Sequence, residues 1–475
     1  MANLAAGGAA ERRSVEWLVT INLQPKRSFP RALVTSPGSA LPPSPPASRL
    51  LLVSIVLLFA VSSPSIAQTR PEELVAEPGH AEQEKARAAY GDRFRVLTTK
   101  HFHVISDTSI RYHTVVAGLL EQFYQLVHPR FFIADMKPVR FYLINGGNDY
   151  ERFMRERGLP NASGYGLYES SSRTLYARRY FPDGRESGVG TLFHEAVHAM
   201  IDADFASSLP PRWVNEGFAS LFEVGRVIRG QWVYGNPNPW RETPFRAAYE
   251  QGDVPSLSAL LTTPDAAFDG TKARCDILYN AGRSLFLFVL RSHGERALAA
   301  YVHRLRQGIE PAKALSAATG LELPEIEQGW HASIRQLNFG GDYLNRGNGL
   351  GGVAVLEEGA RLHPGYGNLQ VTLAIEYLNR EQQSKALMHA RRALEDPHLI
   401  FRQLAQFAVA RAILSTDANA AARALMASLS HQPWNEQIVG DDYEMLSFMF
   451  DEAGDPARAK RVRSDLEAIR RLDIR

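Results

Sequence analysis

Two histidines and two glutamates of this chain have the types and the spacing of a catalytic metal site. His194, Glu195 and His198 form an H-E-x-x-H run, and Glu216 follows in the segment Asn-Glu-Gly-Phe-Ala. On an α-helix residues i and i+4 face the same way, so the two imidazoles can bind one cation. Glu195 then lies within reach of a water on that cation, as a general base. Glu216 supplies a third ligand and leaves the fourth position open, as catalytic zinc requires.

The residues around the two histidines have the pattern of an amphipathic helix. Its apolar stripe comprises Val189, Leu192, Phe193, Ala196, Val197 and Met200. At about 100° per residue the histidines lie opposite this stripe, which gives the helix a core face and a separate metal face. Gly188 and Gly190 precede the helix, Ser207–Pro211 ends it, and Trp213–Glu223 predicts a second apolar helix that carries Glu216. The alternative is a surface helix whose histidines are solvated or hydrogen-bonded.

The H-E-A-V-H and N-E-G-F-A segments resemble those of the gluzincin branch of zinc metallopeptidases, in the peptidase MA-like superfamily. Membrane alanyl aminopeptidases share the second segment. The resemblance implies one Zn²⁺ per chain, bound by His194, His198 and Glu216, with Glu195 as general base. The segment 199–215 between the last two ligands is one residue shorter than in aminopeptidases, a change that the connecting loop can accommodate.

Aminopeptidases also carry an upstream glutamate segment that holds the free amine of the substrate. This chain has no such segment, and the nearest stretch in position is Ser163–Glu169. The resemblance is therefore closer to uncharacterised, secreted MA-like proteins, over about residues 95–340. An aminopeptidase-like enzyme is kept as an alternative.

The segments before the H-E-x-x-H helix alternate between strand and helix patterns. We predict strands at 101–106 and at Val139–Ile144, with a helix over Val115–Leu126 between them. Tyr165–Leu167 and Thr174–Ala177 predict a hairpin. This order is the one that the resemblance implies for the sheet-bearing part of a zincin.

The fold class that follows is α+β: a zincin-like catalytic domain with a small mixed sheet plus helices, then an all-α lobe and C-terminal α-helical repeats. Under the resemblance, the last edge strand of the sheet binds substrate through main-chain hydrogen bonds, and we expect that edge at Thr174–Arg178. We expect an N-terminal extension with signal peptide over residues 1–67 and a linker over 68–94. The H-E-x-x-H subdomain then spans 95–230, and a helical subdomain that completes the cleft spans 231–343. The repeats span 344–475.

Two further residues are candidates for roles around the metal. Tyr279 begins the apolar helix Tyr279–Leu290, and the resemblance implies that a tyrosine from the helical half stabilises the oxyanion. The alternative is that its ring packs in the core and its hydroxyl meets a backbone group. Glu223 lies seven residues beyond Glu216, on the same face of the predicted helix, and can orient a ligand from behind. A solvated acid at the helix end is the alternative.

The C-terminal region resembles a degenerate tetratricopeptide array. Its small and aromatic residues keep the spacing of a helix-pair repeat at Ala374, Tyr377, Ala386, Ala390 and Ala393, closed by Pro397. A weaker copy runs from Tyr443 through Ala459, with Leu404–Leu414 and Ala421–Leu429 as another pair between them. Such arrays form a curved surface for a peptide or partner protein. A helical cap that only covers the catalytic domain is the alternative.

The N-terminal region predicts export. Arg49 precedes the apolar run Leu50–Val61, and Ser65-Ile66-Ala67 follows, which together describe a secretory signal at about residues 49–67. The run is shorter than the roughly twenty residues of a membrane span, so we expect a secreted or periplasmic protein without a stable membrane span after cleavage. The single cysteine, Cys275, excludes an internal disulfide and does not decide the compartment.

Composition narrows the function further. With 53 Lys and Arg against 51 Asp and Glu in 475 residues, the charge balance gives no reason to expect a nucleic-acid partner. The chain has no G-x-S-x-G elbow, phosphate-binding glycine loop or dinucleotide fingerprint. We therefore predict a zinc metallopeptidase acting on a peptide or protein. The rival is a non-catalytic helical-repeat scaffold with a vestigial zinc site.

Overall fold

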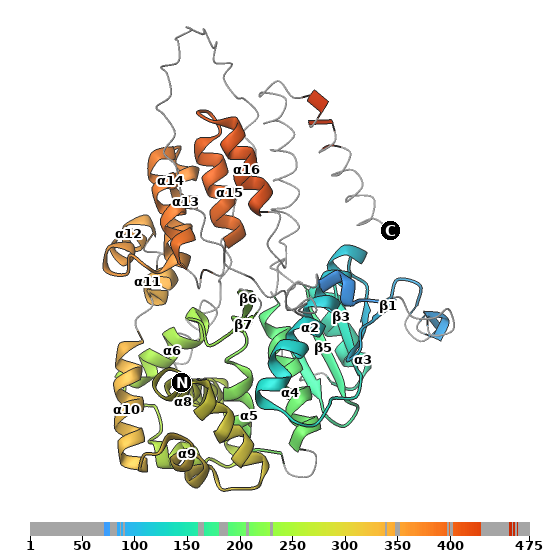
Figure 1. Ribbon diagram of the computed structural model, residues 1–475, viewed down its shortest axis with the longest axis vertical. Helices are drawn as coiled ribbons and strands as arrows, with labels where there is room; N and C mark the ends of the chain where they lie inside the picture. Colours follow the sequence, from blue (N-terminus) through green and yellow to red (C-terminus); the bar gives the residue numbers. More distant parts are fainter. Residues whose placement is uncertain are drawn as a thin grey trace, which may run out of the picture.

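The computed structural model describes residues 71–76, 83–85, 87–88, 91–159, 166–179, 189–205, 209–228, 231–337, 340–346, 352–396, 399, 402–428, 456–457, 459–460 and 463. The predicted signal peptide and most of the weaker repeat copy lie outside these residues. The described part has mixed α and β structure, with one small sheet and many helices (Figure 1). The predicted α+β class is confirmed at this level.

The main sheet has five strands in the order β1-β2-β3-β5-β4. Strands β2, β3 and β5 are parallel, whereas β1 and β4 each run antiparallel to their neighbour, so the sheet is mixed. The strand bounds in chain order are Arg95–Thr98, Phe102–Ser106, Val139–Ile144, Gly166–Glu169 and Thr174–Arg178. The predicted strands and hairpin are confirmed, and β1 was not predicted.

The prediction that Thr174–Arg178 forms the sheet edge is wrong. This strand, β5, pairs with β3 on one side and with β4 on the other. All its residues are buried, whereas β4 is only partly buried after Gly166. The physical reason is the hairpin: its first strand is placed outside the second, because the second already pairs in parallel with β3. The edge strand is therefore β4.

Helices cover both faces of the sheet. Because side chains alternate along a strand, Phe141 and Leu143 face the core shared with α2 (Ile110–Phe131) and α4 (Gly190–Phe205), while Tyr142 packs with α3 (Gly147–Glu156). Helix α2 is longer than the predicted 115–126. It begins where the Ser109 hydroxyl accepts a hydrogen bond from the backbone N–H of Tyr112, a regular N-cap.

The H-E-x-x-H helix, α4, is followed by the helical part of the molecule. Helix α5 spans Arg212–Ala219 and ends before Glu223, so the predicted helix 213–223 is too long. A hairpin of β6 and β7 follows, and then short helices and the long α8, which is interrupted at Gly294 (φ 81°). The bounds of β6 to α10 are Arg226–Ile228, Gln231–Val233, Pro239–Glu250 (α6), Leu257–Leu261 (α7), Asp265–Asp269 (η3), Lys272–Arg306 (α8), Pro311–Thr319 (α9) and Leu323–Gln336 (α10).

The C-terminal described part consists of helices α11 to α16, each in contact with the next along the chain, and α13 to α16 lie side by side in Figure 1. Helices α13 to α16 pack in chain order through small side chains such as Ala390 and Ala405. Their assignment to tetratricopeptide repeats stays a prediction. The bounds of α11 to α16 are Gly341–Arg346, Gly352–Leu362, Gly367–Asn379, Gln383–Glu395, Arg402–Ile413 and Ala418–Ser428. A short 3-10 helix, η2, at Pro71–Leu74 precedes the sheet.

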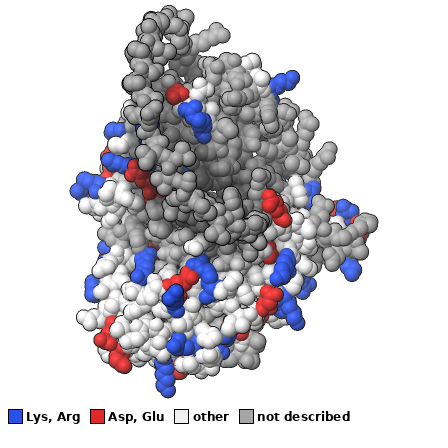
Figure 2. Space-filling view, in the orientation of Figure 1, with Lys and Arg blue, Asp and Glu red and all other residues white. Residues whose placement is uncertain are grey.

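Two surface properties follow from the described residues. None of the described helices combines the length and apolar content that a bilayer crossing requires. On the face shown in Figure 2, Lys and Arg alternate with Asp and Glu, as the nearly equal numbers of bases and acids suggest.

Candidate metal centre

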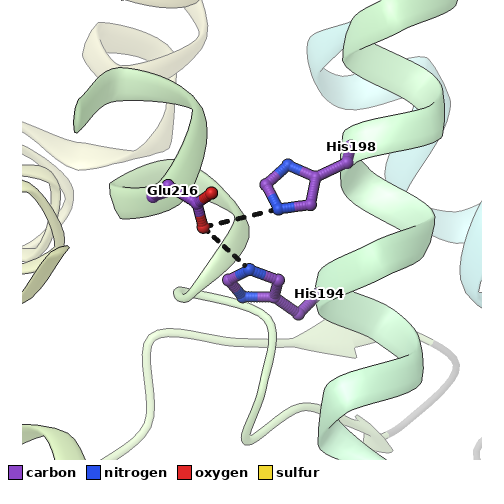
Figure 3. Close-up of side chains that lie close together, drawn as sticks. All are labelled: His194, His198 and Glu216. Carbon is purple, nitrogen blue, oxygen red and sulfur yellow. Dashed lines mark hydrogen bonds and ion pairs between the residues drawn. The ribbon is translucent and has the colours of Figure 1, made fainter. Parts of the chain in front are cut away.

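His194, His198 and Glu216 converge in the structure. The Nε2 atom of His194 lies 3.1 Å from Oε2 of Glu216, and Nε2 of His198 lies 3.5 Å from the same oxygen. Figure 3 shows both imidazoles leaving one side of α4 toward the carboxylate on α5. Among the described residues, His194, His198 and Glu216 form the group of His, Cys, Asp or Glu side chains that could share one cation. Their ligand atoms all lie within 4.8 Å of one another.

Helix α4 holds its two histidines in a protein environment instead of exposing them to solvent. Its apolar side packs into the main core, where Phe193 contacts Phe123 of α2. The histidines are 7% and 8% exposed, because α5 covers the side of the helix that carries them. The predicted separation into a core face and a metal face is consistent with this packing. The alternative of solvated histidines on a surface helix is therefore wrong, whereas its other form, histidines that are hydrogen-bonded, agrees with their contacts to Glu216 and Asn215.

Helix α5 carries Glu216 and packs closely against α8. A Cβ atom on Gly217 would lie 2.6 Å from the backbone carbon of Gly282, a distance that real Cβ contacts do not reach. The two glycines therefore allow the helix backbones to approach each other. This close packing fixes the position of Glu216 relative to α8, which carries Tyr279.

Each histidine has a second partner on its other ring nitrogen. Nδ1 of His198 lies 2.7 Å from Oδ1 of Asn215. Nδ1 of His194 lies 3.0 Å from Oε1 of Glu223, a charged contact that is not aligned as an ideal hydrogen bond. An acceptor at Nδ1 favours the tautomer with its proton there, which leaves the Nε2 lone pair directed at the shared point.

Glu223 is a buried acid and not a solvated one, with a side chain only 7% exposed. Arg241 donates to both of its oxygens, at 2.6 and 3.0 Å, and Nδ2 of Asn238 donates at 2.8 Å. The prediction that Glu223 orients a predicted ligand agrees with its contact to Nδ1 of His194. The reasoning behind it was wrong, since Glu223 lies in a turn after α5 and not on the helical face of Glu216.

The electrostatics of the cluster favour positive charge at its centre. Burial opposes protonation of His194, but the carboxylates of Glu216 and Glu223 outweigh it and raise the pKa to about 10. Burial likewise opposes ionisation of Glu216, yet His198 and His194 hold its pKa well below the ordinary range. Carboxylates that stabilise imidazolium so strongly would also stabilise a divalent cation held between the same atoms.

Glu195 lies next to the three converging side chains but is not one of them. It is 8% exposed, and burial raises the pKa of its carboxyl group, with the charge of Glu216 adding to the rise. The backbone of Tyr168, in the edge strand β4, partly opposes this rise. A Cβ atom on Gly166 would lie 3.2 Å from Glu195 Cγ and 2.7 Å from Thr191 Cγ2, so glycine allows β4 to lie directly against the glutamate.

Tyr279 is partly buried and lies within the electrostatic influence of Glu216. Burial, followed by that charge, raises the pKa of its hydroxyl to about 12, so it keeps its proton at neutral pH. Its ring meets Phe268 edge-on at 5.2 Å between centroids. The side chain of Arg212 partly opposes this rise, whereas the packing alternative predicted a backbone partner for the hydroxyl.

The donor set fits a zinc ion. Two imidazole nitrogens and one carboxylate oxygen are the ligands of many catalytic zinc sites, and both histidines have the second partners that such ligands usually have. No model of a known protein family matches this chain, and no curated protein sequence matches it. The assignment of the site therefore depends on its own residues and geometry.

Several contributors to the site were missed by the sequence analysis, although they surround the predicted ligands. Asn215 lies within the N-E-G-F-A motif, which predicted no role for it, and Tyr168 acts on Glu195 through its backbone, which no side-chain pattern can reveal. Arg241 and Asn238 lie beyond the β-hairpin and carried no motif. Their common feature is contact with a predicted ligand or its partner, which only the folded chain can show.

Proposed function

We propose that this protein is an exported zinc-dependent peptidase of the gluzincin type. The observation that carries the proposal is the convergence of His194, His198 and Glu216 with a buried acid, Glu195, beside them. A metal site with only a structural role ordinarily has four protein ligands and needs no general base. One zinc ion per chain is expected.

The residues of the chain divide the chemistry of peptide hydrolysis among them. Zinc, when bound, supplies Lewis-acid activation of water and of a carbonyl group. Glu195 removes a proton from the attacking water and passes it to the leaving amine, and its raised pKa suits a group that must both accept and return a proton. The hydroxyl of Tyr279 donates a hydrogen bond to the oxyanion that develops on the former carbonyl.

The edge strand β4 supports an extended peptide as the substrate. An edge strand has unpaired main-chain groups on one side, and a peptide can pair with them as an added strand. β4 lies against α4, and Gly166 of β4 lies so close to Glu195 that an added Cβ atom would be 3.2 Å from its Cγ. A peptide paired with β4 would therefore run past the general base. The mixed sheet with an antiparallel edge beside α4 supports a zincin-like arrangement.

Cleavage profiling of a peptide library tests the proposal. We expect the purified protein to contain one zinc ion and to cleave peptides, with activity lost to a chelator and restored by zinc. Glu195→Gln should keep the zinc and lose turnover to background. Glu121→Gln provides a matched control, since this glutamate is also buried but binds His101 in the β1–β2 turn. A Glu195→Gln protein as active as the wild type would refute the mechanism, and cleavage by neither protein would favour the scaffold.

A further inference from the structure

Asp202 lies on the helix that carries both candidate histidine ligands, one helical turn beyond the second of them. Helix α4 spans Gly190–Phe205, and Asp202 follows His198 by the same spacing by which His198 follows His194. Because side chains four residues apart leave a helix on the same side, the carboxylate of Asp202 extends the row of the two imidazoles. Asp202 is not among the side chains that converge on the candidate metal position. Its oxygens contact the edge strand instead.

Both carboxylate oxygens of Asp202 accept hydrogen bonds from the β4–β5 hairpin. The hydroxyl of Tyr168, in β4, donates to Oδ2 at 2.8 Å, and the hydroxyl of Ser170, in the turn that follows, donates to Oδ1 at 2.6 Å. Burial, followed by the hydrogen bond to Asp202, raises the pKa of the Tyr168 hydroxyl, so this group keeps its proton at neutral pH and remains a donor. One side chain of α4 therefore holds both the strand and its turn.

A second contact holds the other end of β4 on α4. Because side chains alternate along a strand, Gly166 and Tyr168 face the same helix. Gly166 lies so close to α4 that an added Cβ atom would be 2.7 Å from Cγ2 of Thr191 and 3.2 Å from Cγ of Glu195. Among the described strands β4 pairs with β5 alone. The position of β4 therefore depends on β5 and on these contacts with α4.

The same hairpin contains another hydroxyl–carboxylate hydrogen bond, which does not reach α4. The hydroxyl of Tyr176, in β5, donates to Oε2 of Glu169 at 3.3 Å. The ring of Tyr176 stacks on Tyr142 and packs in the cluster that includes residues of α3, on the opposite face of the sheet. One bond thus joins the two strands of the hairpin, whereas the bond of Tyr168 joins the hairpin to α4.

We propose that Asp202 is a positioning residue that holds the edge strand β4 against α4, so that a peptide paired with β4 passes Glu195 at a fixed distance. The inference rests on the proposed peptidase function, in which an extended peptide adds to β4. A strand that is already held loses less conformational freedom when a peptide pairs with it, which strengthens binding. Asp202 therefore acts on peptides long enough to pair with β4 and not on short ones that reach only the metal centre.

Steady-state kinetics with a long and a short substrate test this role. The long substrate is the best-cleaved decapeptide of the library, and the short one is the dipeptide at its cleaved bond, blocked at both ends. Asp202→Ala should raise KM for the decapeptide about 10-fold, because two hydrogen bonds are lost. The value of kcat should stay within about twofold, because the peptide pairs with β4 both before and during the reaction. KM for the dipeptide and the zinc content should not change.

Three further variants separate positioning from the stability of the hairpin. Tyr168→Phe keeps the ring, removes one of the two hydrogen bonds and should raise KM for the decapeptide about 3-fold, a result that is available even if Asp202→Ala does not fold. Asp202→Asn keeps one acceptor oxygen and should recover part of the loss. Tyr176→Phe is the matched control and should have the KM of the wild type for both substrates.

Several kinetic outcomes would overturn the inference. A rise in KM of equal size for both substrates, or a loss of zinc, means that Asp202 acts on the metal centre and not through β4. An unchanged KM in both Asp202→Ala and Tyr168→Phe means that the two hydrogen bonds only stabilise the fold. A rise in Tyr176→Phe equal to that in Tyr168→Phe means that binding responds to any loosening of the hairpin and not to its attachment to α4.

Peptide binding without turnover distinguishes failure of this inference from failure of the proposed function. Fluorescence anisotropy measures the binding of labelled library decapeptides to zinc-loaded Glu195→Gln, and Asp202→Ala in this background should weaken it about 10-fold. If the wild type cleaves no peptide but this loss of affinity occurs, the peptidase proposal fails and the positioning role stands. If the wild type cleaves peptides and Asp202→Ala matches it in KM and affinity, the positioning role alone fails. Absence of binding by every decapeptide also overturns the inference.

Discussion

The part of the chain that contains the sheet and the candidate metal centre, residues 91–337, and the C-terminal helices, residues 340–428, bury different kinds of side chain. Around the metal centre the structure buries ionisable groups that contact one another, such as His194, Glu223 and Arg241. The C-terminal helices instead pack through alanines, and their buried polar groups include amides such as Gln370. Because buried charge is costly unless it is paired, its concentration in one region indicates where the chemistry lies.

Two histidines illustrate the difference, since both are 7% exposed. His194 faces the carboxylates of Glu216 and Glu223, which raise its pKa to about 10 despite burial. His389 of α14 hydrogen-bonds the amide oxygen of Gln370 at 2.7 Å, and burial followed by Arg392 lowers its pKa to about 4. Burial alone therefore does not distinguish these two histidines, whereas the charge of their neighbours does.

The largest expected effect comes from replacing each of these histidines by alanine, because one change should remove function and the other should lower only the stability. His194→Ala should abolish zinc binding and peptide cleavage, because only two ligands remain. His389→Ala should leave both intact and lower the free energy of unfolding by about 1–3 kcal/mol, since Gln370 loses its buried partner. Zinc content, peptide cleavage and urea denaturation measure the two effects. Loss of zinc from His389→Ala would break the comparison.

Neutralising Glu223, whose carboxylate contacts Nδ1 of His194, should have the next largest effect. Glu223→Gln keeps the size of the side chain but weakens its contact with His194, so zinc affinity should fall roughly 10- to 100-fold. Competition with a chromogenic chelator measures this affinity. Glu295→Gln is the control, because Glu295 also pairs with an arginine, Arg130, but contacts no histidine. Equal affinities in the two variants would show that Glu223 does not support the ligand.

Glu242 extends the comparison to pH, because it lies on α6, which packs against α11 where the two regions meet. Burial raises its pKa to about 7, against the opposing charges of Arg283 and Arg291. The folded-state pKa is raised, so the stabilising contribution is complete below about pH 4.5 and is lost as the pH rises to about 7. The wild type should therefore lose about 3 kcal/mol relative to Glu242→Gln over this interval.

Urea denaturation of chelator-treated protein at several pH values measures that difference. The chelator removes metal binding as a source of pH dependence, and the histidines are common to both proteins. Glu250→Gln, an exposed position on the same helix, should follow the wild type. Parallel stability curves for the wild type and Glu242→Gln would contradict the prediction.

The smallest effect is expected at the crossing of α5 and α8. In Gly217→Ala the new methyl group would meet the backbone of Gly282, and we expect a loss of about 2 kcal/mol despite the better helix propensity of alanine. Gly365→Ala, between α12 and α13, has nothing within 4 Å of the new atom and should change stability by less than about 0.5 kcal/mol. Thermal unfolding compares them, and equal stability would mean that the helices separate readily.

The sequence predicted that His194 and His198 lie together because that information was local, and the structure brings Glu216 to them. An i, i+4 spacing places His194 and His198 together on any helix, and strand alternation at Val139–Ile144 needs no distant partner. Predictions that depended on distant parts of the chain were weaker. The edge of the sheet was assigned to β5 because strand order depends on pairing and not on composition. The helix of Glu216 was extended to Glu223 because apolar residues continue after Ala219, where the chain turns to bury them.

What the sequence by itself determined is the set of reactive groups: two histidines and two glutamates whose spacing allows them to serve one metal ion. What only the tertiary structure decided is their environment, from the Glu223–Arg241 pair next to His194 to the Asn215 side chain next to His198. The physical reason is that ligand identity depends on local spacing. Protonation, orientation and the position of the edge strand depend on contacts between segments far apart in the chain.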